Sequence, residues 1–205
     1  MQNTAPLTPG LIYHIYNRGN NGENLFREER NYAYFLRLYA HHITPVAHTF
    51  AYCLVRNHFH LLIRVKTDEE AATYRKLHRL TTPAGAYNPS RSFSNLFNAY
   101  TKAINRAYNR TGSLFEERFH RIPVETDAYF LNLVFYIHYN PQKHGFTANF
   151  RDWRWSSYTA LAADQPTRLQ KEEVIAWFGD VAHYQQFHTG LVNEKAIARL
   201  IEDDE

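Results

Sequence analysis

The chain has 205 residues and a formal net charge of +3 at pH 7, and its 44% of hydrophobic residues is enough to bury a core and excludes general disorder. No apolar run reaches the roughly 18 residues of a membrane span, and the N-terminus lacks the basic and apolar regions of a secretion signal. One cysteine, Cys53, excludes an intramolecular disulfide framework, so we expect a reduced cytoplasmic protein without a membrane partner.

Short strands and helices are predicted in turn along the chain. Strand-forming residues alternate with period two in four segments, and aromatic and leucine residues recur at helical spacing between them. The predicted strands cover residues 11–17, 48–55, 58–65 and 118–125. The predicted helices cover residues 28–43, 69–80, 93–108 and 127–139, the last one capped by Thr126 or Asp127 and ended by Pro141.

This order of elements predicts an α+β fold. It lacks the regular strand–helix repeat of a parallel sheet, so we expect an antiparallel sheet with flanking helices packed on it. Residues 1–149 then form the main domain. Residues 150–205, which include the segment WRWSSY, form a small C-terminal helical appendage.

Two histidines lie two positions apart in the third predicted strand. Since side chains alternate faces along a strand, His58 and His60 share one face with Leu62, while Phe59 and Leu61 face the core. The two imidazoles are then about 7 Å apart, close enough to converge on one divalent cation. The alternative is a strand that carries two exposed polar residues.

A tyrosine and an asparagine lie four residues apart at the end of the last predicted helix, on one helical face. The phenol of Tyr136 becomes a nucleophile when a cation or a base lies nearby. Asn140 offers a carbonyl oxygen to a metal or a phosphate. A metal site made by His58, His60 and Asn140 beside this tyrosine would neutralise a phosphodiester and align it for attack. The alternative is an aromatic helix face packed on the sheet.

Positive charge is concentrated between residues 71 and 122, where nine Lys and Arg minus two Glu leave a local charge of +7. Such side chains bind phosphates without reading sequence, and the interleaved tyrosines can stack on unpaired bases. Solvated helix faces are the alternative. Arg18, in a turn-rich loop, can reach base edges. The other candidate DNA contacts are Arg75, Arg91, Lys102, Arg106, Arg110, Arg118 and Arg121.

Four ordered motifs point to one family. They are YHIYNRGNNGENLF, NHFHLLI, GSLFEERFHR and YIHYNP, within a stretch from about Leu11 to Gly145. NHFHLLI resembles the His-hydrophobic-His motif of the HUH single-tyrosine transposases, and YIHYNP resembles their tyrosine-bearing helix. The chain is most similar to the REP-associated tyrosine transposases and related insertion-sequence transposase-like proteins.

The resemblance implies a ferredoxin-like sheet, with His58, His60 and Asn140 as metal ligands and Tyr136 as the nucleophile. It implies attack on single-stranded DNA, giving a 5′-phosphotyrosine that a 3′-hydroxyl can reverse. The expected cation is Mg²⁺ or Mn²⁺, although imidazoles also accept Zn²⁺. The expected partner is single-stranded or hairpin DNA, bound by a monomer or a homodimer.

Two other functions stay open at this point. A domesticated DNA-binding protein of the same fold would recognise hairpins without cutting them. The second is a metal-dependent hydrolase of another class, or a structural module in which the His-x-His pattern is incidental. It lacks a general-base carboxylate clustered with the histidines. Tyr129, seven residues before Tyr136, is the second candidate for the nucleophile.

Overall fold

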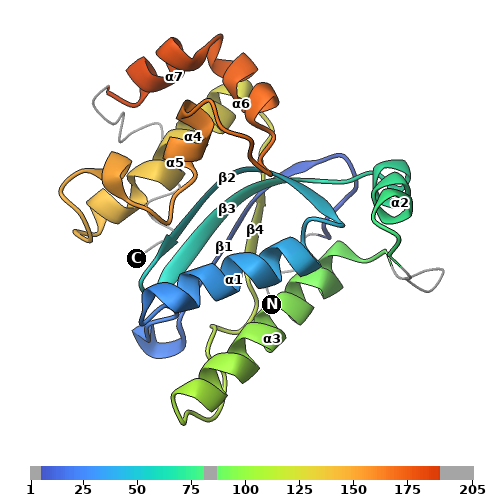
Figure 1. The fold of residues 1–205 in the computed structure, drawn as a ribbon, viewed down its shortest axis with the longest axis vertical. Helices are drawn as coiled ribbons and strands as arrows, with labels where there is room; N and C mark the ends of the chain where they lie inside the picture. The colour runs from blue at the N-terminus through green and yellow to red at the C-terminus, as the bar shows by residue number, and fades with distance from the viewer. Residues whose placement is uncertain (1–5, 81–86, 190–205) are drawn as a thin grey trace.

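A four-stranded antiparallel sheet forms the centre of the structure, a computed structural model that describes residues 6–80 and 87–189 (Figure 1). The strands lie in the order β2–β3–β1–β4. Their bounds are Ile12–Arg18 for β1, Ala47–Val55 for β2, His58–Val65 for β3 and His120–Pro123 for β4. One helix follows β1 and two separate β3 from β4, which is the ferredoxin-like order, so the predicted α+β fold class is confirmed.

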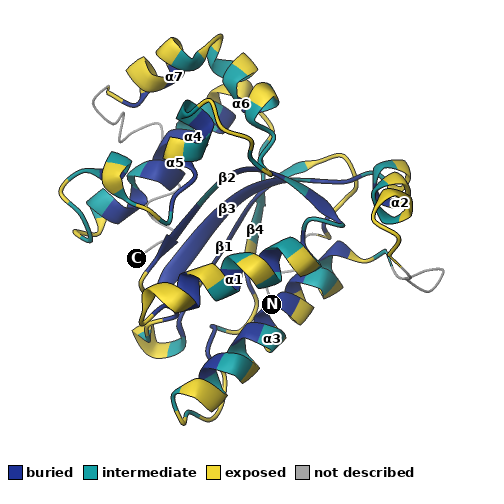
Figure 2. Cartoon of the chain, viewed as in Figure 1, coloured by how far each residue is buried: buried dark blue, intermediate teal, exposed yellow. Residues whose placement is uncertain are grey.

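Two helices, α1 (Glu29–His42) and α3 (Pro89–Ala107), pack on one face of the sheet. The buried side chains of α3 recur at helical spacing and share a core with Phe59 and Leu61 of β3. Strands β1, β2 and β3 are buried almost throughout, while α1 turns an exposed side outward (Figure 2). A 3-10 turn, η1 (Asn20–Gly22), follows β1, and α2 (Asp68–Leu77) follows β3. No helix in the described ranges has the length and apolar character needed to cross a membrane.

The other face of β2 and β3 is covered by α4 (Asp127–Lys143). The hydroxyl of Thr126 accepts a hydrogen bond from the N–H of Tyr129 over 3.2 Å, which confirms the predicted start of this helix. The prediction that Pro141 ends it was wrong, because α4 continues to Lys143. Pro141 lies in the last turn of α4, where it removes one N–H donor. The helix still closes after it, because the N–H of His144 donates to the carbonyl of Asn140.

Residues 150–189 lie against α4 and along the outer edge of β2. They form η2 (Phe150–Asp152), α5 (Tyr158–Ala162), α6 (Lys171–Phe178) and α7 (Val181–Phe187). The N–H of Leu54 donates to the carbonyl of Trp155, and the N–H of Ser157 donates to the carbonyl of Tyr52, each over 2.9 Å. The described part of the predicted appendage therefore bonds to the edge of the sheet and shares a core with α4. Its residues 190–205 lie outside the described ranges.

A buried chain of hydrogen bonds joins the end of α7 to α4 and β2. His188 Nδ1 lies 2.7 Å from the carbonyl oxygen of Tyr184, and His188 Nε2 lies 2.9 Å from His138 Nδ1. His138 Nε2 in turn lies 2.8 Å from Ser157 Oγ, which accepts the N–H of Tyr52 over 2.8 Å. With one proton on each imidazole, every donor in this chain meets an acceptor, so both histidines are satisfied in their neutral form.

Candidate active site

The two histidines of β3 and the asparagine of α4 meet in the space between the sheet and the helix. His58 Nε2 lies 2.7 Å from Asn140 Oδ1, and His60 Nε2 lies 3.1 Å from Asn140 Nδ2. All three residues are buried. The alternation of β3 turns both imidazoles toward α4, and the last turns of α4 bring Asn140 to them. The structure thus brings together the three residues predicted as metal ligands.

The donor set fits a divalent cation. His58 Nδ1 lies 3.0 Å from Asn57 Oδ1 and donates to it when that nitrogen carries the proton. In that tautomer, His58 Nε2 and Asn140 Oδ1 are both acceptors, and a cation bound by the two of them would satisfy both. Within residues 6–80 and 87–189, no group of three or more His, Cys, Asp and Glu side chains is placed to hold a metal, so this candidate set depends on the asparagine.

Both imidazoles are in the protonation state that binds metals. Burial, and to a lesser extent the neighbouring His144, lowers the pKa of His58 to about 3. Burial also holds the pKa of His60 well below its usual value, with His14 as the next contribution. Neutral imidazoles present a lone pair at neutral pH, so no proton has to leave before a cation binds.

Tyr136 lies one helical turn before Asn140 and is fully buried. Its ring meets the ring of His60 edge-on, with 5.5 Å between the centroids. Lys143 Nζ donates a hydrogen bond to Tyr136 Oη over 3.4 Å. The ammonium supplies the nearby positive charge that the activation of a phenol requires. A phosphate can reach this hydroxyl only after the side chains that enclose it move.

A cavity of about 260 Å³ opens beside His58 and His60. The end of β1, the start of β3, the start of β4 and the segment before β4 form its walls. The exposed ring of His120 stacks on Tyr16 with 4.5 Å between the centroids and 11° between the planes. Arg18 Nε pairs with Glu116 Oε1 over 2.7 Å in the same wall. The cavity therefore presents a stacking surface and an ion pair next to the candidate metal ligands.

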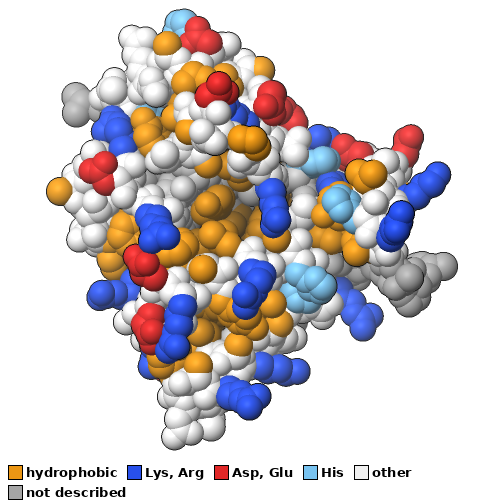
Figure 3. Space-filling view, viewed as in Figure 1, with side chains coloured by type: hydrophobic (Ala, Val, Ile, Leu, Met, Phe, Trp, Pro, Cys, Tyr) orange, Lys and Arg blue, Asp and Glu red, His pale blue; other side chains and the backbone are white. Residues whose placement is uncertain are grey.

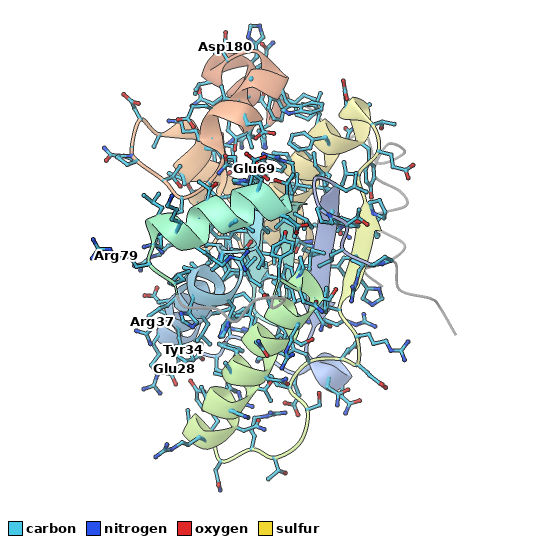
Figure 4. The ribbon with its side chains drawn as sticks, turned by 90° about the vertical axis from the view of Figure 1, so that its right-hand side faces the viewer. Glu28, Tyr34, Arg37, Glu69, Arg79 and Asp180 are labelled. Carbon is cyan, nitrogen blue, oxygen red and sulfur yellow. The ribbon has the colours of Figure 1, made fainter. Side chains whose placement is uncertain are left out.

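The predicted DNA contacts do not gather at this cavity. Arg18 lines it, and Arg118 and Arg121 lie beside His120 at the start of β4. Arg121 donates to Ser90 Oγ over 2.9 Å and covers the ring of Phe119. The other predicted DNA contacts lie away from the cavity. Arg75 belongs to α2, and Arg110 follows α3. Helix α3, on the face of the sheet opposite α4, carries Arg91, Lys102 and Arg106. Lys and Arg side chains are scattered over the face drawn in Figure 3, and Arg79 projects from the end of α2 (Figure 4).

Sequence reasoning missed three residues around the candidate ligands. His14, on β1, lies 3.0 Å from His60, and Asn57 contacts His58. His120 belongs to none of the patterns that the sequence singles out, and the structure places it in the cavity wall. Period-two alternation puts His14 on one face of its strand, but only the pairing of β1 with β3 shows that this face carries His60.

Comparisons with known proteins show what this chain resembles in sequence and in fold. No protein-family model matches the chain. A protein of Haemophilus influenzae named as a REP-associated tyrosine transposase is 27% identical over 110 residues, which are 54% of this chain and 58% of that protein. In sequence, the chain is thus similar to a REP-associated tyrosine transposase. The aligned part spans little more than half the length of that transposase, so the activity of the whole relative is carried over only as a proposal.

A solved structure of a REP-associated tyrosine transposase bound to a REP hairpin has the same fold. It matches this chain with a TM-score of 0.59 and 15% identity, over 81% of this chain and 88% of the other. At this identity the match concerns the fold alone. The resemblance to REP-associated tyrosine transposases that the motifs predict is confirmed by the sequence match, and the predicted sheet architecture is confirmed by the structural one.

Proposed function

We propose that this protein cleaves and rejoins single-stranded DNA beside a hairpin, through a covalent phosphotyrosine on Tyr136. The observation that carries the proposal is the meeting of His58, His60 and Asn140 with this tyrosine between β3 and α4. The two imidazoles and the amide oxygen would hold Mg²⁺ or Mn²⁺. Such a cation supplies charge neutralisation at the phosphate.

The chain's own residues account for the covalent step. Tyr136 Oη bonds to the phosphorus and loses its proton to solvent. The bond between the phosphorus and the 3′-oxygen breaks, and that oxygen leaves as a free 3′-hydroxyl. Lys143, beside the phenol oxygen, offsets the negative charge that develops there during attack. The phosphotyrosine conserves the bond energy, so a 3′-hydroxyl reverses the step without ATP.

Hairpin DNA is the partner we propose, because a relative of the same fold was solved bound to a REP hairpin. The cavity beside His58 offers stacking on His120 and polar contacts from Arg18 to an unpaired nucleotide near the cleaved bond. The cytoplasmic location and the choice between monomer and homodimer stay predictions.

The proposed function is tested on a denaturing gel with one oligonucleotide labelled at either end. With Mn²⁺ and the 3′-labelled DNA, we expect a labelled band at the size of protein plus DNA. With the 5′-labelled DNA, we expect a shortened free strand that ends in a 3′-hydroxyl. A 5′ label retained on the protein would reverse the proposed polarity.

A second candidate is a hairpin-binding protein of the same fold that does not cleave. The complete burial of Tyr136 favours it, because an enclosed hydroxyl does not meet a phosphate. Tight binding to hairpin DNA, together with no covalent band under any metal condition, would establish this alternative.

His58→Ala should lower the rate of adduct formation by more than about 100-fold, because it removes one of three donors from the candidate metal set. High Mn²⁺ should restore part of the rate, since a weakened site is filled by mass action. The measurement is the initial rate of the covalent band against Mn²⁺ concentration. His41→Ala, at an exposed histidine of α1, is the matched control and should behave as the wild type. A loss that Mn²⁺ leaves unchanged would argue against a ligand role.

Arg106→Ala should weaken binding to many DNA sequences alike if α3 contacts the DNA backbone. Each phosphate contact contributes about 0.7 to the slope of log affinity against log salt for single strands, so the variant should show a shallower slope. Fluorescence anisotropy across a salt series measures both quantities. Arg37, on the outer side of α1 beside Tyr34, supplies the control variant Arg37→Ala (Figure 4). An affinity that is flat with salt would remove the basic stretch from the binding surface.

A further inference from the structure

His14 lies behind the candidate ligands, on the neighbouring strand β1. Its Nε2 lies 3.0 Å from His60 Nδ1, and the two rings stack with 22° between their planes. Both residues are buried, with 2% and 0% of their surfaces exposed. In the pairing of β1 with β3, Tyr16 is opposite His60, so His14 reaches His60 diagonally on the side of the sheet that faces α4. His14 contacts Nδ1 of His60, whereas the other ring nitrogen of His60, Nε2, faces Asn140.

We propose that His14 is a positioning residue that accepts a hydrogen bond from His60 Nδ1 and so directs the Nε2 lone pair of His60 toward Asn140. The proposal rests on the proposed function, because it concerns the form of His60 that would bind a cation. A neutral imidazole carries one proton on one of its two nitrogens. Coordination through Nε2 leaves that proton on Nδ1, where His14 Nε2 is the acceptor in place. A partner at this nitrogen fixes both the tautomer and the ring orientation.

The other nitrogen of His14 argues against a role in packing alone. His14 Nδ1 is buried and has no hydrogen-bond partner among the residues that the structure describes. Leaving a polar atom unpaired in a core is unfavourable, and a phenylalanine would avoid it. A phenylalanine would also keep the stacking on Tyr16, whose ring centroid is 4.8 Å away. The one feature of His14 that phenylalanine could not replace is the Nε2 atom, which faces His60.

Two substitutions at position 14 separate positioning from packing. His14→Gln places an amide oxygen near the position of Nε2 and keeps an acceptor for His60. His14→Phe keeps the ring and its stacking but removes the acceptor. If His14 positions His60, His14→Phe should weaken Mn²⁺ binding about 10- to 100-fold, and His14→Gln should stay within roughly threefold of the wild type. If His14 only packs, the order reverses, with phenylalanine harmless and glutamine damaging, and the proposal is overturned.

The measurement is a Mn²⁺ titration of the full chain without DNA, by calorimetry, with a thermal melt of each variant as the folding control. A second readout is long-range proton–nitrogen NMR of the His60 ring in the protein without metal. Wild type and His14→Gln should show a single form with the proton on Nδ1. A His14→Phe protein with the same spectrum and the same affinity as the wild type would also overturn the proposal.

The same titration distinguishes a failure of His14's role from a failure of the proposed metal site. If His60→Ala abolishes Mn²⁺ binding while His14→Phe binds as tightly as the wild type, only the role of His14 is lost. If the wild type binds no Mn²⁺, or if His60→Ala binds it unchanged, the metal site and the role of His14 are overturned together.

Discussion

Tyr136→Phe should form no covalent adduct with DNA, while its fold and its affinity for hairpin DNA stay close to those of the wild type. The substitution removes only the hydroxyl and keeps the buried ring against His60. The lost hydrogen bond from Lys143 is long, at 3.4 Å, so we expect a stability change of about 1 kcal/mol or less. The proposed covalent route is lost, because phenylalanine has no oxygen that can bond to phosphorus. The denaturing gel and a thermal melt measure the two effects.

Tyr129→Phe is the matched control for this prediction. Tyr129 lies in the first turn of α4, about 10 Å along the helix axis from Tyr136, and its hydroxyl removal should leave the adduct unchanged. A covalent band that persists in Tyr136→Phe and disappears in Tyr129→Phe would move the nucleophile to the start of the helix. Loss of the band in both variants would mean that adduct formation needs both hydroxyls of α4, and the assignment of the nucleophile to Tyr136 would then not be supported.

Acidification from pH 7 to about pH 4.5 should destabilise the protein strongly through its buried histidines. Burial lowers the pKa of His188 to about 4 and that of His14 to about 3, and it holds the pKa of His138 well below its usual value. These groups are neutral in the folded chain, whereas the unfolded chain takes up protons below about pH 6.5. Their contribution to stability is therefore complete above about pH 6.5 and is lost as the pH falls toward the folded values.

Part of this loss of stability at low pH should arise where His188 and His138 are joined by buried hydrogen bonds. A second proton on either imidazole places a positive charge in a buried position, where the loss of hydration disfavours it. His188 alone contributes at most about 3 to 4 kcal/mol, because its pKa falls from 6.5 to about 4 and each tenfold change is worth about 1.4 kcal/mol. Urea unfolding at a series of pH values measures the loss.

His188→Gln tests the assignment, since glutamine does not titrate. This variant should be less stable than the wild type at pH 7, and the difference should shrink toward pH 4.5 as the wild type loses its advantage. His41→Gln, at an exposed histidine, should follow the wild type throughout. A free energy of unfolding that does not change over this pH range would contradict the prediction.

Local rules were sufficient for the centre of the candidate site. Period-two alternation places His58 and His60 away from Phe59, and the structure separates them in this way. A spacing of four along a helix puts Tyr136 and Asn140 on one side, and both turn toward β3. These relations depend only on the geometry of one strand and one helix, which the sequence carries directly.

Relations between elements were beyond the sequence. The contact of His14 with His60 depends on the register of β1 against β3, and register is set by the assembled core. The apolar side of α3 shows that the helix packs on the sheet, but not on which face. Arg106 and Lys102, which the sequence predicts as contacts to the DNA backbone, lie in the layer opposite α4.

The pairing of Trp155 and Ser157 with β2 means that the shortest working version of this protein is longer than the family motifs suggest. The motifs end near Gly145, yet a fragment cut at residue 149 would leave the backbone of Leu54 and Tyr52 without these partners and would uncover the apolar side of α4. An unpaired, apolar strand edge recruits other strands and leads to aggregation. Experiments on such a fragment would report precipitation in place of chemistry, so every assay of nicking or hairpin recognition needs the C-terminal helices attached.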